Sequence, residues 1–144
     1  MSLEIGSSLG ELLAAQQDDD DALLYPSLQA YAGAVAELCQ RLRSPMVWPV
    51  GPTAERLAGA AVVESCGGVR LRGWNDDLSG ERVLLLAGAA VTPLGLYAAA
   101  EQARRLGVSE VMAAGIRVAG VEARGSIDHF FPLEAASAQR RRTA

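Results

Sequence analysis

The sequence predicts a single α/β domain built on a mostly parallel sheet flanked by helices. Short apolar runs of strand length alternate with longer segments in which apolar residues recur every three or four positions. The run at residues 82–90 is apolar at consecutive positions, which is typical of a strand covered on both faces. The chain has 144 residues, of which 50% are hydrophobic and 21% charged, so it is long enough to bury one core.

We expect residues 1–26 to be an N-terminal appendage, residues 27–134 the α/β domain and residues 135–144 a flexible tail. The appendage contains one short helical piece and a block of like charge, Asp18 to Asp21. Four adjacent carboxylates could suggest a metal site, but a solvated helix start is the favoured interpretation. The tail has no apolar periodicity.

The first long helix of the domain is predicted to start at Ser27. Its apolar residues share one face, and they are Leu28, Tyr31, Ala32, Val35, Leu38, Cys39 and Leu42. A strand is expected at residues 45–51, followed by a helix over 54–64. Thr53 is the candidate N-cap of that helix, and Gly67 and Gly68 mark its end.

Three further strands are predicted at residues 69–74, 82–90 and 108–118. The helix between the last two is expected to have Thr92 as its N-cap, Pro93 as its first residue and Gly107 as its stop. Its buried face should comprise Leu96, Ala99, Ala100, Ala103 and Leu106. Because the sheet is mostly parallel, ligand-binding loops should gather at the carboxyl ends of the strands.

Composition excludes several kinds of chemistry. All 13 basic residues are Arg, so Schiff-base formation, a Walker-type lysine and a lysine general base are not possible. The only histidine is His129, which limits any site to one imidazole. We expect Cys39 and Cys66 to be small buried residues, since two isolated thiols make neither a disulfide framework nor a zinc site.

Charge and hydropathy bear on partners and location. The net charge of −4 gives no basic field for nucleic acid. No apolar stretch approaches the roughly 20 residues that a membrane span needs. The first residues lack the basic start and apolar core of a signal peptide, so we expect a cytoplasmic protein.

The loop from Val91 to Leu96 is a candidate phosphate-binding site, with Thr92, Leu94, Gly95 and Leu96 as its binding residues. If Thr92 caps the helix, the backbone N–H groups of Leu94, Gly95 and Leu96 should point outward without acceptors. Together with the helix dipole they would attract an anion, and Gly95 would allow close approach. An ordinary capped helix has the same pattern.

Residues 83–106 resemble the signature segment of the type I phosphoribosyltransferases. In that family four apolar residues, two acidic residues and two apolar residues lead to a Thr-Thr-Gly loop and a helix. The apolar strand corresponds to residues 83–86, and Thr92 is the one loop position that clearly matches. Ala87 and Gly88 stand where the acidic pair belongs.

The resemblance extends upstream, covering residues 25–120 as an order of elements. Gly51, Pro52 and Thr53 occupy the place of the loop that receives pyrophosphate, after the first strand. The helix before that strand also has a counterpart in the family, for example in orotate phosphoribosyltransferase. The resemblance implies a phosphate-bearing small molecule as ligand and a homodimer as the assembly.

The acidic pair of the family binds the ribose hydroxyls of phosphoribosyl pyrophosphate (PRPP) and supports its magnesium complex. Ala87 and Gly88 can do neither. The sequence therefore predicts a divergent phosphoribosyltransferase-like protein that binds a nucleotide or sugar phosphate without ordinary transferase activity. No cofactor is certain, and Mg²⁺ is expected only if the protein is active. One alternative is an active enzyme of nucleotide metabolism with non-standard metal contacts; another is a non-catalytic dimeric scaffold.

Several other polar and aromatic residues are candidate functional groups. Asp76 and Asp77 could supply the metal contacts, but in a turn between two adjacent strands ordinary turn chemistry is favoured. His129 beside Asp128 is expected to be an edge-strand histidine, because neighbouring strand residues point to opposite faces.

Arg70 and Arg72 share one strand face. They would suit a carboxylate or phosphate, or equally a solvated sheet edge. Trp48 and Trp74 could be packing anchors or could stack on a base, and packing is the favoured interpretation.

Overall fold

A computed structural model describes residues 27–73, 76–88, 91–116 and 126–133. It contains one five-stranded sheet in which every strand pair is parallel, in the order β2-β1-β3-β4-β5. The strands are β1 (Met46–Val50), β2 (Arg70–Leu71), β3 (Arg82–Ala87), β4 (Glu110–Gly115) and β5 (His129–Pro132). The predicted α/β class is confirmed. The expected appendage and tail lie outside the described residues.

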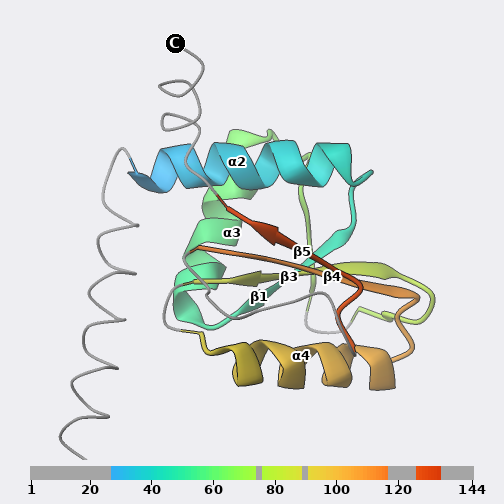
Figure 1. The fold of residues 1–144 in the computed structure, drawn as a ribbon. Helices are drawn as coiled ribbons and strands as arrows, with labels where there is room; N and C mark the ends of the chain where they lie inside the picture. Colours follow the sequence, from blue (N-terminus) through green and yellow to red (C-terminus); the bar gives the residue numbers. More distant parts are fainter. Residues whose placement is uncertain (1–26, 74–75, 89–90, 117–125, 134–144) are drawn as a thin grey trace, which may run out of the picture.

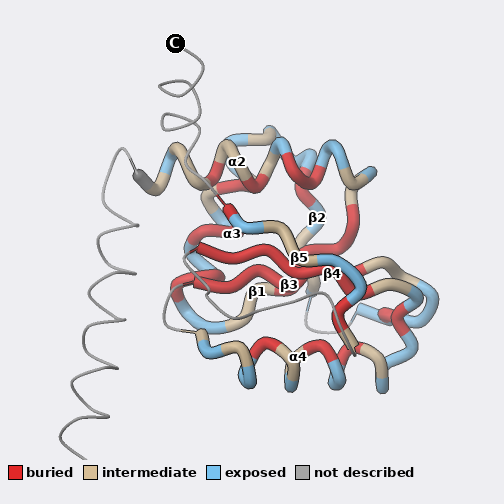
Figure 2. The backbone as a smooth tube through the Cα atoms, in the orientation of Figure 1, coloured by how far each residue is buried: buried red, intermediate tan, exposed pale blue. Residues whose placement is uncertain are grey.

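Three helices form layers on the two faces of the sheet (Figure 1). α2 (Ser27–Arg41) and α3 (Pro52–Glu64) lie on one face, and α4 (Pro93–Arg105) lies on the other. Consecutive strand residues point to opposite faces, so β3 supplies both cores. Leu84 and Leu86 pack with α2 and α3, whereas Val83 and Leu85 pack with α4. The burial of the sheet between the helices is visible in Figure 2.

α3 begins two residues earlier than expected. Gly51 is its N-cap residue, with φ of 92°, and Pro52 is its first residue. Thr53 is therefore not the cap but a buried residue of the first turn. The physical reason is that proline has no N–H to leave unsatisfied and a φ suited to a helix start, so Pro52 sets the boundary.

α4 matches its prediction at the start and differs at the end. Thr92 is the N-cap residue and its side chain accepts a hydrogen bond from the Gly95 N–H. Leu96, Ala100 and Ala103 are buried as expected. Leu106, assigned to the buried face, is instead 44% exposed. It follows the last helical turn, where the chain leaves the helical path towards Gly107, so the helical period no longer fixes its direction.

The two cysteines differ in burial. Cys39 lies on the buried face of α2, and desolvation raises the pKa of its thiol to about 11. Cys66 was expected to be buried and is exposed. It follows α3 with a φ of 53°, so the chain has already left the helix face that packs on the sheet.

β2 is shorter than the predicted strand at residues 69–74. It pairs with Met46 and Val47 of β1, and the Arg72 N–H extends the ladder by donating to the Val47 carbonyl oxygen. Among the described residues, β1 has no further pairing on this side. Pro49, two residues after Val47, faces the same side as the Val47 carbonyl group, so its missing N–H removes no hydrogen bond between β1 and β3. A proline is therefore accommodated in a strand that has neighbours on both sides.

Within the part of the chain that the structure describes, no helix has the length and apolar content to cross a membrane.

Candidate functional site

Two loops lie side by side at the carboxyl edge of the sheet. β1 and β3 are adjacent, and Val50 is in register with Ala87, so the chain leaves both strands at the same level. The first loop leads into α3 and the second into α4. They approach closely, since a Cβ added to Gly51 would lie 3.8 Å from the Val91 Cγ2 atom. The structure thus brings together the two segments that the sequence nominated.

The first loop depends on glycine at its turn. The φ of Gly51 is in a region that other residues rarely adopt, and its carbonyl oxygen accepts the Glu55 N–H at 3.1 Å to open α3. Gly51 and Pro52 are exposed, whereas Thr53 is 8% exposed. The loop therefore presents mainly backbone to a ligand.

The second loop has fewer free donors than predicted. The Gly95 N–H donates to Thr92 Oγ1 at 3.1 Å, and the Leu96 N–H donates to the Thr92 carbonyl oxygen at 3.0 Å. The expectation that both groups lack acceptors is wrong, because the capping residue satisfies them itself. Of the three candidates, Leu94 alone has no hydrogen bond of this kind to Thr92. The residue is 81% exposed.

The positions of the family's acidic pair are filled by small buried residues. Ala87 is fully buried and belongs to the cluster beneath α4, and its carbonyl oxygen accepts the Ile116 N–H at 3.1 Å. Gly88 is also buried. Neither residue offers the oxygen ligands that Mg²⁺ requires. The residues present do not fit a metal-supported PRPP site of the family type.

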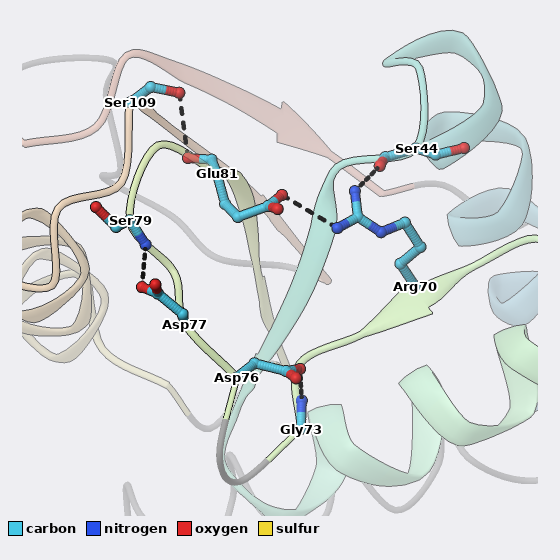
Figure 3. A network of polar contacts seen from close by, with 8 residues as sticks. All are labelled: Ser44, Arg70, Gly73, Asp76, Asp77, Ser79, Glu81 and Ser109. Atoms are coloured by element: carbon cyan, nitrogen blue, oxygen red, sulfur yellow. Dashed lines mark hydrogen bonds and ion pairs between the residues drawn. The ribbon is translucent and has the colours of Figure 1, made fainter.

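Asp76 and Asp77 have local roles (Figure 3). The Asp76 carboxylate accepts the Gly73 N–H, and the Asp77 carboxylate accepts the Ser79 N–H at 2.9 Å. The preferred turn interpretation is confirmed. The expectation that this turn connects two adjacent strands is wrong, because β1 lies between β2 and β3 in the sheet. No group of three or more metal-ligating side chains occurs among the described residues.

The two strand arginines have different partners. Arg70 donates to the Ser44 carbonyl oxygen and to the Glu81 carboxylate, both at 3.1 Å, which ties β2 to the chain entering β1 and β3 (Figure 3). The Arg72 guanidinium lies 3.9 Å from the centroid of the Trp48 ring. Trp48 is buried, as its packing interpretation predicts. Trp74 lies outside the described residues.

His129 and Asp128 do not form a catalytic pair. Asp128 accepts hydrogen bonds from Arg104 and from the Val111 N–H, which fastens β5 to α4 and β4. Although desolvation opposes it, these bonds hold the pKa of Asp128 below its ordinary value. His129 is the exposed first residue of edge strand β5, as predicted, and its ring centroid lies 6.3 Å from that of Phe131.

Sequence reasoning missed a pocket that borders the first loop. It has a volume of about 430 Å³ and is lined by Trp48, Pro49, Glu55, Leu71, Arg72 and Gly73. Trp48 and Arg72 are separate candidates in the sequence, and their contact depends on the register of β1 with β2. Nothing in the sequence marks Glu55 as a pocket residue, because a carboxylate in the first turn of a helix is common.

Comparison with known proteins identifies the fold. No protein-family model matches the sequence, and no curated protein matches it. Among solved structures, the purine phosphoribosyltransferase of Pyrococcus horikoshii is 16% identical, with a TM-score of 0.53 over 77% of this chain and 86% of that chain. The hypoxanthine phosphoribosyltransferase of Trypanosoma cruzi is 12% identical, with a TM-score of 0.51 over 73% and 77%. Together with the all-parallel sheet and its flanking helices, these similarities show that the chain has a type I phosphoribosyltransferase-like fold.

Proposed function

We propose that this protein binds a nucleotide or sugar phosphate at the two loops and does not catalyse ordinary phosphoribosyl transfer. The observation that carries the proposal is the burial of Ala87 and Gly88 at the end of β3, where the resembling family has its acidic pair. Transfer from PRPP develops positive charge on the sugar, and carboxylates placed there would stabilise it. A methyl group and a glycine supply no such stabilisation.

Phosphate binding without transfer is supported by the adjacent helix starts. α3 and α4 both begin at the carboxyl edge, after neighbouring strands. The positive ends of their dipoles favour an anion there, and the N–H of Leu94, an exposed residue, is the remaining candidate donor. Because the chain has no Lys and Thr92 takes up two of the three N–H groups, affinity should be weak, on the order of millimolar.

The activity arm of the test measures pyrophosphate release from PRPP with Mg²⁺ and each common base. An active phosphoribosyltransferase in the same assay serves as the positive control. We expect no release above background. Turnover that disappears in Asp76→Ala or Asp77→Ala would establish the alternative of an active enzyme with non-standard metal contacts.

The binding arm follows amide NMR shifts during titration with inorganic phosphate. We expect shifts in residues 91–96 and 51–55 that weaken with added salt. Leu94→Pro removes the Leu94 N–H at a helical position where proline is tolerated, and Leu94→Ala is the matched control that keeps it. Shifts lost only in Leu94→Pro support the proposal. No shifts in the unmodified protein would favour the dimeric scaffold.

A further inference from the structure

The two helix starts at the candidate site differ in how far they satisfy their own N–H groups. α4 has a side-chain cap, because Thr92 Oγ1 accepts the Gly95 N–H. α3 has none, because its N-cap residue is Gly51. The first hydrogen bond of α3 runs from the Glu55 N–H to the Gly51 carbonyl oxygen. The α3 side of the site therefore keeps donors of a kind that the α4 side has used.

Thr53 has a hydroxyl group without a partner in the first turn of α3. Its N–H precedes the first helical hydrogen bond, so it has no acceptor within α3 either. The hydroxyl makes no hydrogen bond with another described residue. No enclosed side-chain oxygen in the described part of the chain lacks a hydrogen bond, so this hydroxyl is not enclosed. Although Thr53 is only 8% exposed, it therefore reaches the surface with a free hydroxyl.

Arg56 lies on the same face of α3 as Thr53. It follows Thr53 by three residues and Pro52 by four, spacings at which helical side chains are neighbours, with Cβ atoms about 5–6 Å apart. Helical side chains incline towards the N-terminus, so the long side chain of Arg56 extends over the first turn.

The Arg56 guanidinium is available to a ligand. Arg56 is an exposed residue. It takes part in none of the ion pairs among the described residues, which are Arg70–Glu81, Arg82–Glu110 and Arg104–Asp128. A cation and an unpaired hydroxyl thus lie on one face at the start of α3, where the helix dipole also favours an anion.

We infer that Arg56 is the cationic side chain of the proposed phosphate site and that it holds the anion on the α3 side. The phosphate would accept hydrogen bonds from the Arg56 guanidinium and the Thr53 hydroxyl. Glu55 lines the pocket next to Leu71 of β2, on nearly the opposite side of the helix from Thr53. Its carboxylate opposes anion binding from there and keeps the affinity low. The inference rests on the proposed function, since it adds a residue to the same site.

Titration with inorganic phosphate, followed by amide NMR, tests the role of Arg56. Arg56→Gln should weaken phosphate binding about fivefold, because one charge-assisted contact is lost at an exposed position. Arg105→Gln is the matched control, since it removes the same charge from an exposed residue in the last turn of α4. It should leave the dissociation constant unchanged within about twofold, because solvent and salt screen a charge at that distance.

Thr53 is tested in the same titration. Thr53→Val removes the hydroxyl and keeps the branched shape of the side chain, so it should weaken phosphate binding about threefold through one lost hydrogen bond. Thr53→Ser keeps the hydroxyl and should bind phosphate like the unmodified protein. Amide shifts outside residues 51–56 and 91–96 should stay the same in every variant, which checks that the fold is retained.

Salt distinguishes a charge contact from an indirect effect on the loop. Phosphate affinity of the unmodified protein should fall steeply with added potassium chloride, because the Arg56 charge is screened. In Arg56→Gln the fall should be shallower. A purely structural effect of the substitution would lower the affinity without changing this slope, and that result would contradict the inference.

The remaining outcomes separate the inference from the proposed function. Equal dissociation constants for Arg56→Gln and the unmodified protein would overturn the inference and leave the proposed function standing. Equal weakening in Arg56→Gln and Arg105→Gln would also overturn it, since net charge would then explain the effect. Absence of phosphate shifts in the unmodified protein would overturn the proposed function and the inference together.

Discussion

Thr92 shows how one capping residue both supports a helix and limits a binding site. Its Oγ1 accepts the Gly95 N–H and its carbonyl oxygen accepts the Leu96 N–H, so it stabilises the start of α4. The same two bonds remove donors that a phosphate could have used. A stronger cap therefore means a weaker anion site at this position.

Substituting Thr92 measures the first of these effects. Thr92→Ala should lower the free energy of unfolding by about 1 kcal/mol, because a capping hydrogen bond is lost. Urea denaturation gives the value. Thr92→Ser is the control that keeps the hydroxyl and should remain close to the unmodified protein. Equal stability of all three would mean that the cap contributes nothing to folding.

Asp128 should make stability depend on acidity. The hydrogen bond from the Val111 N–H and the Arg104 guanidinium lower its pKa in the folded state. A lowered folded-state pKa stabilises the protein above the unfolded pKa of about 3.9, and this contribution disappears as pH falls through the folded value. The effect should be modest, since the Asp128 side chain is 38% exposed and solvent screens it.

The comparison is between the unmodified protein and Asp128→Asn. Their difference in unfolding free energy should be largest near neutral pH and should shrink under strongly acidic conditions. Urea curves at a series of pH values provide the measurement. A difference that grows as pH falls would contradict the assignment.

β3 is the element on which both cores depend. It lies between β1 and β4, and residues 83–87 are fully buried. Leu85→Asp should therefore destabilise the protein by several kcal/mol, because it buries a carboxylate with no partner beneath α4. Leu94→Asp is the matched control, since Leu94 is 81% exposed and the change should be nearly neutral. Thermal unfolding of the two variants should separate clearly, and similar melting would refute the central position of β3.

Elements with strong periodicity were the ones that the sequence predicted well. α2 has the face expected from its 3.6-residue repeat, and β3 and β4 are buried strands as their apolar runs indicate. The predicted length of β2 was too great, since the strand covers only Arg70–Leu71 of the predicted residues 69–74. How far this segment pairs depends on β1, and the alternation of its side chains does not reveal that. Arg72 makes one further backbone hydrogen bond to β1, and its side chain stacks on Trp48.

The candidate site also has features that the sequence predicts and features that it does not. The nearness of the Gly51 and Val91 loops follows from the parallel topology, which the pattern of elements predicts. Whether the Gly95 N–H remains free does not follow, because it depends on the rotamer of Thr92. The Leu96 N–H is different, because its bond to the Thr92 carbonyl oxygen is the first hydrogen bond of the predicted helix. The Glu55 and Arg72 pocket depends on how far β2 extends, which is a tertiary property.

At the scale of the whole molecule, the two cores should unfold together. They share one sheet, since alternate residues of β3 enter opposite clusters. We expect a single two-state transition in urea, because neither face can lose its helices without exposing the strands of the other. Far-UV circular dichroism should coincide with Trp48 fluorescence measured in a Trp74→Phe background. Separate midpoints would indicate that the face covered by α4 unfolds independently.

Pro49 also affects how this molecule meets copies of itself. An unpaired strand edge is ordinarily a template on which another chain can add a strand and begin to aggregate. Pro49 lies in β1 beyond the last residue that pairs with β2, and it offers no N–H donor to an incoming strand. Pro49 therefore opposes strand addition by a second molecule at this position. The pocket that Pro49 lines can admit a small solute, whereas a strand of another chain would find no donor there.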